Sequence, residues 1–162
     1  RYCLDHDSRL NIEIKPTPGT ERQTGEVVAQ AAAQLWQGAA VPPLLSSFQP
    51  ESLAGAQAAA PSLPRALLLD SLWEGWLDAA RRLDCVAVVC KYTLWDVALV
   101  ARARAAGLRC LCYTVNDAGA ARDLLALGLD GLITDRVDFF DPAQPDSVAV
   151  NPHAAPDVRR GT

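Results

Sequence analysis

The chain has 162 residues, half of them hydrophobic, which is enough for one sizeable core and one domain. A net charge of −4 gives none of the basic field that nucleic-acid binding requires. No apolar run approaches the ~20 residues of a membrane span, so we expect neither a nucleic-acid partner nor a membrane-spanning segment. The chain begins at Arg1 and contains no Met, and we expect it to be a fragment of a longer protein.

Five cysteines lie mainly in apolar runs: Cys3, Cys85, Cys90, Cys110 and Cys112. Cysteine is among the most buried residue types, so this pattern predicts core thiols. Cys110 and Cys112 would share one strand face, a geometry that could hold a metal, but no second Cys or His pair accompanies them. The odd count disfavours a secreted disulfide framework and favours a reducing compartment.

The first half of the chain alternates short apolar runs with helical segments. Residues 10–14 (LNIEI) have the alternation of a strand, and residues 17–25 are rich in Thr, Pro and Gly, as in a loop. A helix is expected at residues 26–37, where Gly38 marks its end. A strand at residues 44–48 follows, and then a helix that Pro50 and Glu51 open and that runs to about Ala60.

The second half continues in the same way. A strand is expected at residues 65–69, then a helix from Ser71 to about residue 83, with Ser71 and Glu74 as a capping box. The remaining expected elements are a strand at 86–89, a helix at 94–106, a strand at 108–115, a helix at 117–127 and a strand at 132–133.

Strict alternation of strands and helices predicts a parallel sheet, either open and doubly wound or closed into a barrel. No Gly-x-Gly-x-x-Gly follows any strand, which disfavours a dinucleotide fold. A closed barrel has eight strands and about 250 residues. The spacing therefore favours an α/β fold, an incomplete (β/α)₈ TIM barrel with about six of eight strands in residues 1–140, followed by a loosely ordered tail at 141–162.

Chemistry in such barrels lies at the C-terminal ends of the strands. The first expected strand delivers Glu13 and Lys15 there, on one face because strand side chains alternate. The pair could be a structural salt bridge at the rim. Alternatively, Glu13 is an oxygen ligand for a hard cation and Lys15 binds phosphate.

Other strand ends offer weaker candidates. Tyr113 could form a wall of the site, and Asn116 could present its amide or simply cap the next helix. Lys91 is expected to be a solvated loop charge, and Thr134-Asp135 to make local turn bonds. His6 and His153 lie away from strand ends, so the pattern offers no general base.

Four segments resemble, in order, the motifs of the glycerophosphodiester phosphodiesterase family. They are Leu10–Pro16 (LNIEIKP), Leu44–Phe48 (LLSSF), Tyr113–Asn116 (YTVN) and Gly128–Asp135 (GLDGLITD). The match spans about residues 1–140 and corresponds to the C-terminal three-quarters or so of such a barrel. The segments at residues 11–17 (NIEIKPT), 34–36 (QLW) and 64–70 (PRALLLD) look closest to the bacterial cytosolic branch, which is linked with glycerol-3-phosphate uptake.

The resemblance implies hydrolysis of small-molecule glycerophosphodiesters to sn-glycerol 3-phosphate and an alcohol. It also implies a divalent metal, Mg²⁺ or Ca²⁺, and a cytoplasmic location. Glu13 matches a metal ligand of the family and Lys15 the lysine near the phosphate. Phe48, Tyr113 and Asn116 match positions that line the substrate pocket.

The family's first-strand His-Arg-Gly, second-strand Glu-x-Asp and following His-Asp have no counterpart in this sequence. Acid–base catalysis contributes about 10²–10⁴-fold, so the intact protein is expected to be the enzyme and this chain alone to be inactive. The alternative is a non-catalytic barrel remnant, either a pseudoenzyme or a subunit completed by a partner chain. Head-group preference and oligomeric state are not indicated by the sequence.

Overall fold

A computed structural model describes residues 2–6, 8–137 and 140. Within these residues, six strands form one sheet in sequence order, and every neighbouring pair is parallel. The predicted alternation of strands and helices is therefore confirmed. The strands are β1 (Asn11–Glu13), β2 (Leu44–Ser47), β3 (Arg65–Leu69), β4 (Cys85–Lys91), β5 (Arg109–Tyr113) and β6 (Gly131–Leu132).

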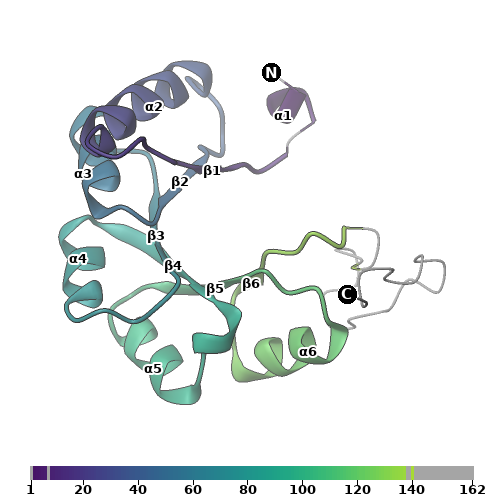
Figure 1. Ribbon diagram of the computed structural model, residues 1–162. Coiled ribbons are helices and arrows are strands. Elements are labelled where there is room, and N and C mark those ends of the chain that lie inside the picture. The colour runs from purple at the N-terminus through teal and green to yellow at the C-terminus, as the bar shows by residue number, and fades with distance from the viewer. Residues whose placement is uncertain (1, 7, 138–139, 141–162) are drawn as a thin grey trace, which may run out of the picture.

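The sheet is curled, and the helices that follow its strands lie along the convex side (Figure 1). In that view the concave side is open, and β1 and β6 form the two ends of the arc. Such a shape is what part of a (β/α)₈ barrel would have. The helices are α1 (Tyr2–Asp5), α2 (Glu21–Leu35), α3 (Pro50–Ala59), α4 (Trp76–Arg82), α5 (Val97–Ala105) and α6 (Ala118–Leu127), with a 3₁₀ turn, η1 (Tyr92–Leu94).

The two faces of the sheet bury different sets of side chains. Toward the helices, alternate strand residues such as Leu45, Leu67 and Val88 pack against apolar helix faces. Toward the concave side, a smaller apolar cluster joins neighbouring strands: Ala66, Leu68, Ala87 and Val89, with Leu44, Leu111 and Tyr113 packed against it. Both faces of the central strands are apolar, which is typical of the strands of a parallel sheet.

Helix α2 begins at Glu21, so the loop predicted at residues 17–25 is wrong for its last five residues. Gly25, which is typical of a loop, instead allows α2 to pack closely against α3. A Cβ on Gly25 would lie 1.9 Å from the backbone oxygen of Ser52 in α3. The Ser52 hydroxyl also donates to the Glu21 carbonyl at 3.0 Å, so the two helices meet at backbone distance.

Two other helix starts differ from the prediction. The capping box at Ser71 and Glu74 does not form, because the Ser71 hydroxyl bonds Asp70 and α4 begins only at Trp76. The helix expected from residue 94 begins at Val97, where the Asp96 carboxylate accepts from the Leu99 N–H at 2.7 Å. In both cases the first residues of the predicted helix form the connection that leaves the strand end.

All five cysteines are free thiols, and the four in or beside strands are buried. Their side chains belong to the helix-facing core, which confirms the prediction of core thiols. Burial raises the pKa of Cys85, Cys90 and Cys112 to about 12. These thiols therefore act as small apolar groups at neutral pH.

Within the described residues, no helix is long and apolar enough to cross a membrane. The prediction for the tail at 141–162 lies outside the described residues, as does His153.

Candidate functional site

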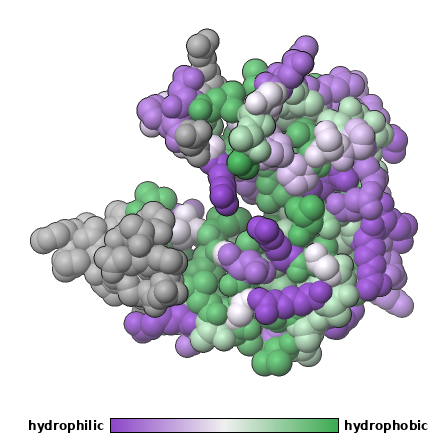
Figure 2. All heavy atoms as spheres, turned by 180° about the vertical axis from the view of Figure 1, so that it is seen from behind, coloured by the Kyte–Doolittle hydropathy of each residue, from purple (hydrophilic) through white to green (hydrophobic). Residues whose placement is uncertain are grey.

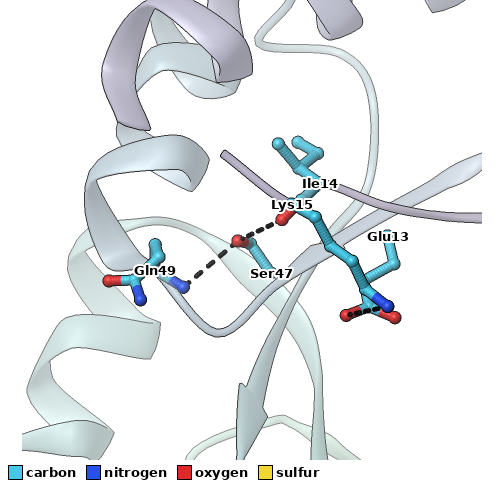
Figure 3. Close-up of polar contacts among 5 residues, drawn as sticks. All are labelled: Glu13, Ile14, Lys15, Ser47 and Gln49. Atoms are coloured by element: carbon cyan, nitrogen blue, oxygen red, sulfur yellow. Dashed lines mark hydrogen bonds and ion pairs between the residues drawn. The ribbon is translucent and has the colours of Figure 1, made fainter. Parts of the chain in front are cut away.

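Glu13 ends β1, and Lys15 follows two residues later with its side chain on the same side. Lys15 Nζ lies 3.5 Å from Glu13 Oε1, with 77% of the lysine side chain and 34% of the glutamate side chain exposed. Between them, Ile14 is buried against the helices. Figure 3 shows the charged pair on one side of the strand and the Ile14 carbonyl bonded to Ser47 on the other.

The pair lies in a hollow of about 270 Å³ at the C-terminal ends of the strands. Phe48 after β2 and Tyr113 at the end of β5 also line it, and Asn11, Leu68, Thr114 and Ile133 complete it. Seen from behind in Figure 2, the concave side is a notch where hydrophilic and hydrophobic side chains meet. The hollow therefore combines opposite charges with apolar walls, as small-molecule sites commonly do.

Phe48 and Tyr113 form one aromatic wall of the hollow. Their ring centroids are 5.7 Å apart in an edge-to-face arrangement, a geometry that aromatic pairs prefer. The Tyr113 hydroxyl donates to the Leu69 carbonyl at 3.0 Å, which fixes the ring. Burial, with smaller effects of Asp70, Cys90 and Glu13, raises the pKa of Tyr113, so the phenol stays protonated at neutral pH.

Asn116 joins the ends of β5 and β6 and is not among the residues that line the hollow. Its Oδ1 accepts from the Thr134 hydroxyl and the Asp135 N–H, each at 3.0 Å. The alternative role of helix cap is wrong, because Asp117 caps α6. A direct contact between Asn116 and substrate stays a prediction.

Three further residues show what sequence reasoning found and missed. His6 is exposed in the turn after α1, with its ring 4.3 Å from that of Tyr2, away from the hollow as expected. Lys91 is exposed at the end of β4, also as expected. Asn11 also lines the hollow and is missing from the predicted site, although the alternation that pairs Glu13 with Lys15 places it on the same face.

The donor set fits one ligand of a hard divalent cation and not a complete site. Glu13 supplies a carboxylate that faces a polar hollow, which is the oxygen chemistry that Mg²⁺ and Ca²⁺ prefer. The described part of the chain contains no group of three or more His, Cys, Asp or Glu side chains able to hold a metal. We therefore assign no reaction step to a metal.

Solved structures define the class to which this fold belongs. A phosphodiesterase from Oleispira antarctica, in complex with the product sn-glycerol-3-phosphate, is 29% identical with a TM-score of 0.71, over 81% of this chain and 53% of that one. Glycerophosphodiester phosphodiesterases from Parabacteroides distasonis and Thermotoga maritima show the same fold. Their identities are 16% and 20%, their TM-scores 0.65 and 0.59, and the matches cover 87% and 80% of this chain and 56% and 54% of theirs.

The chain is thus part of a phosphodiesterase-type (β/α)₈ barrel, and the predicted incomplete barrel is confirmed. The glycerophosphoryl diester phosphodiesterase family matches residues 1–139, and the chain belongs to that family. Members of the family generally depend on a divalent metal. No curated protein matches the chain. The chain spans about half the length of its structural relatives.

Proposed function

We propose that the protein to which this chain belongs hydrolyses glycerophosphodiesters to sn-glycerol 3-phosphate and an alcohol. The observation that carries the proposal is the Glu13–Lys15 pair in a hollow at the C-terminal ends of parallel strands. That edge is where barrel enzymes hold their substrates. The sn-glycerol-3-phosphate bound to the Oleispira antarctica relative supports the same substrate class here.

Lys15 is the proposed catalytic residue of this chain. Its Nζ is held by Glu13 at 3.5 Å, yet 77% of the side chain is exposed, so the ammonium can reach a ligand without losing its partner. In hydrolysis, water attacks phosphorus, the bond from phosphorus to the alcohol oxygen breaks, and negative charge builds up on the phosphoryl oxygens. An ammonium placed beside these oxygens stabilises that charge in the transition state.

Glu13 is the proposed metal ligand, and Mg²⁺ or Ca²⁺ the proposed ion. A carboxylate suits either cation, and each needs about six oxygens, so other residues and water must complete the coordination. When bound, the cation would neutralise negative charge on the phosphate. The role of Glu13 in this chain is to present a negatively charged oxygen to the hollow while its partner Lys15 balances the charge.

Phe48, Tyr113 and Asn116 are the proposed substrate-binding residues. The edge-to-face rings of Phe48 and Tyr113 give a rigid apolar wall that suits the carbon skeleton of the substrate. Asn116 holds the loop after β6 beside the end of β5 and would act mainly through that loop. Buried free thiols support the further proposal of a cytoplasmic protein.

We propose that this chain alone is inactive, because the hollow presents one carboxylate and one ammonium and no histidine. The proposal that the intact protein is an enzyme competes with a second one, a non-catalytic barrel remnant that is either a pseudoenzyme or a subunit completed by a partner chain. Turnover by the full-length gene product that contains these residues separates the enzyme from the remnant. A pseudoenzyme would fold correctly and would not hydrolyse glycerophosphodiesters.

The test is hydrolysis of glycerophosphocholine by the full-length protein with Mg²⁺ or Ca²⁺, compared with its Glu13→Gln variant. Glu13→Gln keeps the side-chain size and removes the charge, so metal affinity should fall strongly and activity with it. The measurement is release of sn-glycerol 3-phosphate over a metal titration. Folded protein without activity in either metal, or a Glu13→Gln variant with unchanged metal dependence, would refute the proposal.

A further inference from the structure

Ser46 in β2 carries a buried hydroxyl without a partner. The residue is 0% exposed, and its Oγ makes no hydrogen bond within the described residues. The neighbouring Ser47 is equally buried, but its hydroxyl donates to the Ile14 carbonyl at 2.8 Å and accepts from the Gln49 N–H at 3.1 Å. A buried unpaired hydroxyl is costly, so a specific unmade bond at Ser46 calls for an explanation.

The strand geometry places Ser46 beside Glu13. The two residues are Cα partners in the β1–β2 ladder, and strand side chains alternate between faces. Leu45 and Ser47 lie toward the helices, whereas Leu44 packs against the concave-side cluster, so Ser46 faces the concave side together with Glu13. Ala66, the partner of Ser46 on its other side, brings no polar group.

Neighbouring strands lie ~4.8 Å apart, so the Ser46 hydroxyl is within reach of the Glu13 carboxylate after a rotation of the glutamate side chain. One carboxylate oxygen of Glu13 already pairs with Lys15. A carboxylate has about four acceptor positions on its two oxygens, so it can serve an ammonium, a hydroxyl and a cation together. Glu13 therefore has the capacity for a second donor.

We propose that Ser46 is a positioning residue for Glu13: its buried hydroxyl donates to the carboxylate and holds it in the orientation that binds the divalent cation. The inference rests on the proposed role of Glu13. Partners that orient a metal ligand in this way typically change metal affinity by about 10–100-fold. The same contact would satisfy the hydroxyl that otherwise lacks a partner.

The adjacent serines provide a matched experiment in the full-length protein. Ser46→Ala should weaken the affinity for Mg²⁺ about 10–100-fold, with an unchanged or higher midpoint of denaturant unfolding in metal-free buffer, because no existing bond is lost. Ser47→Ala should leave the affinity for Mg²⁺ unchanged and lower the unfolding midpoint, because the Ser47 hydroxyl already bonds Ile14 and Gln49 and both bonds would be lost. Affinity is measured by titration calorimetry with MgCl₂, repeated with CaCl₂.

Ser46→Cys keeps a side chain of similar size with a much weaker donor, so it should resemble Ser46→Ala in affinity. Unchanged affinity in both Ser46 variants, or a lower unfolding midpoint with unchanged affinity, would overturn the inference and indicate a purely structural hydroxyl. Glu13→Gln separates the two proposals. If it weakens Mg²⁺ binding and the Ser46 variants do not, only the role of Ser46 fails; if it has no effect, both fail.

Discussion

Removing the Lys15 ammonium should lower kcat strongly and the free energy of unfolding only slightly. At 3.5 Å, two unit charges attract by about 1.2 kcal/mol in water, and exposed ion pairs usually contribute ~0.2–1 kcal/mol. The lysine side chain is 77% exposed, so Lys15→Ala should lower the free energy of unfolding by less than about 1 kcal/mol. Loss of one electrostatic contact to the transition state typically costs about 10²–10³ in kcat.

The assay combines denaturant unfolding with glycerophosphocholine turnover in the full-length protein, for Lys15→Ala, Glu13→Gln and the double variant. Lys91→Ala is the matched control, because the chain has only two lysines and Lys91 is also exposed at a strand end but does not line the hollow. We expect its kcat to stay within about threefold, since surface substitutions away from a site have small effects. A coupling energy of several kcal/mol in unfolding, together with unchanged kcat for Lys15→Ala, would show that the pair is a structural salt bridge.

Two further predictions concern stability. Gly25→Ala should lower the free energy of unfolding by ~1–3 kcal/mol, because the added methyl group would clash with the backbone of Ser52, even though Ala is favoured in helices. Gly119→Ala is the control and should be nearly neutral, because its added methyl group would meet only the Asp117 side chain, at 3.1 Å; equal unfolding midpoints for the two variants would contradict the packing described. The thiols of Cys85, Cys90 and Cys112 have a pKa of about 9 in the unfolded chain and about 12 in the folded protein. The free energy of unfolding should therefore fall as the pH rises from about 9 to about 12. An unfolding free energy that stays constant over this pH range would contradict the burial of these thiols.

The strands were predictable because each strand leaves a local signal. The segment at residues 65–69 forms β3 with the expected bounds, since its last four residues are apolar and Pro64 and Asp70 flank it. The parallel order followed from the helical segments between the strands. Closure into a barrel was less certain from pattern alone, because an open doubly wound sheet has the same alternation.

The helix starts were less predictable because they depend on contacts between distant segments. Thr24-Gly25 has the composition of a loop, yet Gly25 is helical where α2 meets the backbone of α3. A sequence cannot show that a glycine is needed for close approach before the partner helix is known. Asp96 could have been recognised, since an acidic residue before an Ala- and Val-rich run is a common cap.

The candidate site divides in the same way. Period-2 alternation alone places Glu13 and Lys15 together, because they lie on one strand. The edge-to-face contact of Phe48 with Tyr113 joins the residue that follows β2 to the last residue of β5. The unpartnered Ser46 hydroxyl is visible only once burial is known. Relations across several strands therefore required the three-dimensional structure.

The concave face is apolar in the middle of the sheet and carries the Glu13–Lys15 pair at the strand ends, and the apolar part influences the electrostatics of the pair. Ala66, Leu68, Ala87 and Val89 form an apolar cluster on this face, and Leu68 also lines the hollow that contains Glu13 and Lys15. Apolar surroundings lower the effective dielectric, so charges in the hollow act more strongly on a bound phosphate than they would on an open surface. Partial exposure of Glu13, at 34%, avoids the full cost of burying a carboxylate. The apolar cluster therefore strengthens the electrostatics of the site, while the open strand ends keep both charged groups accessible.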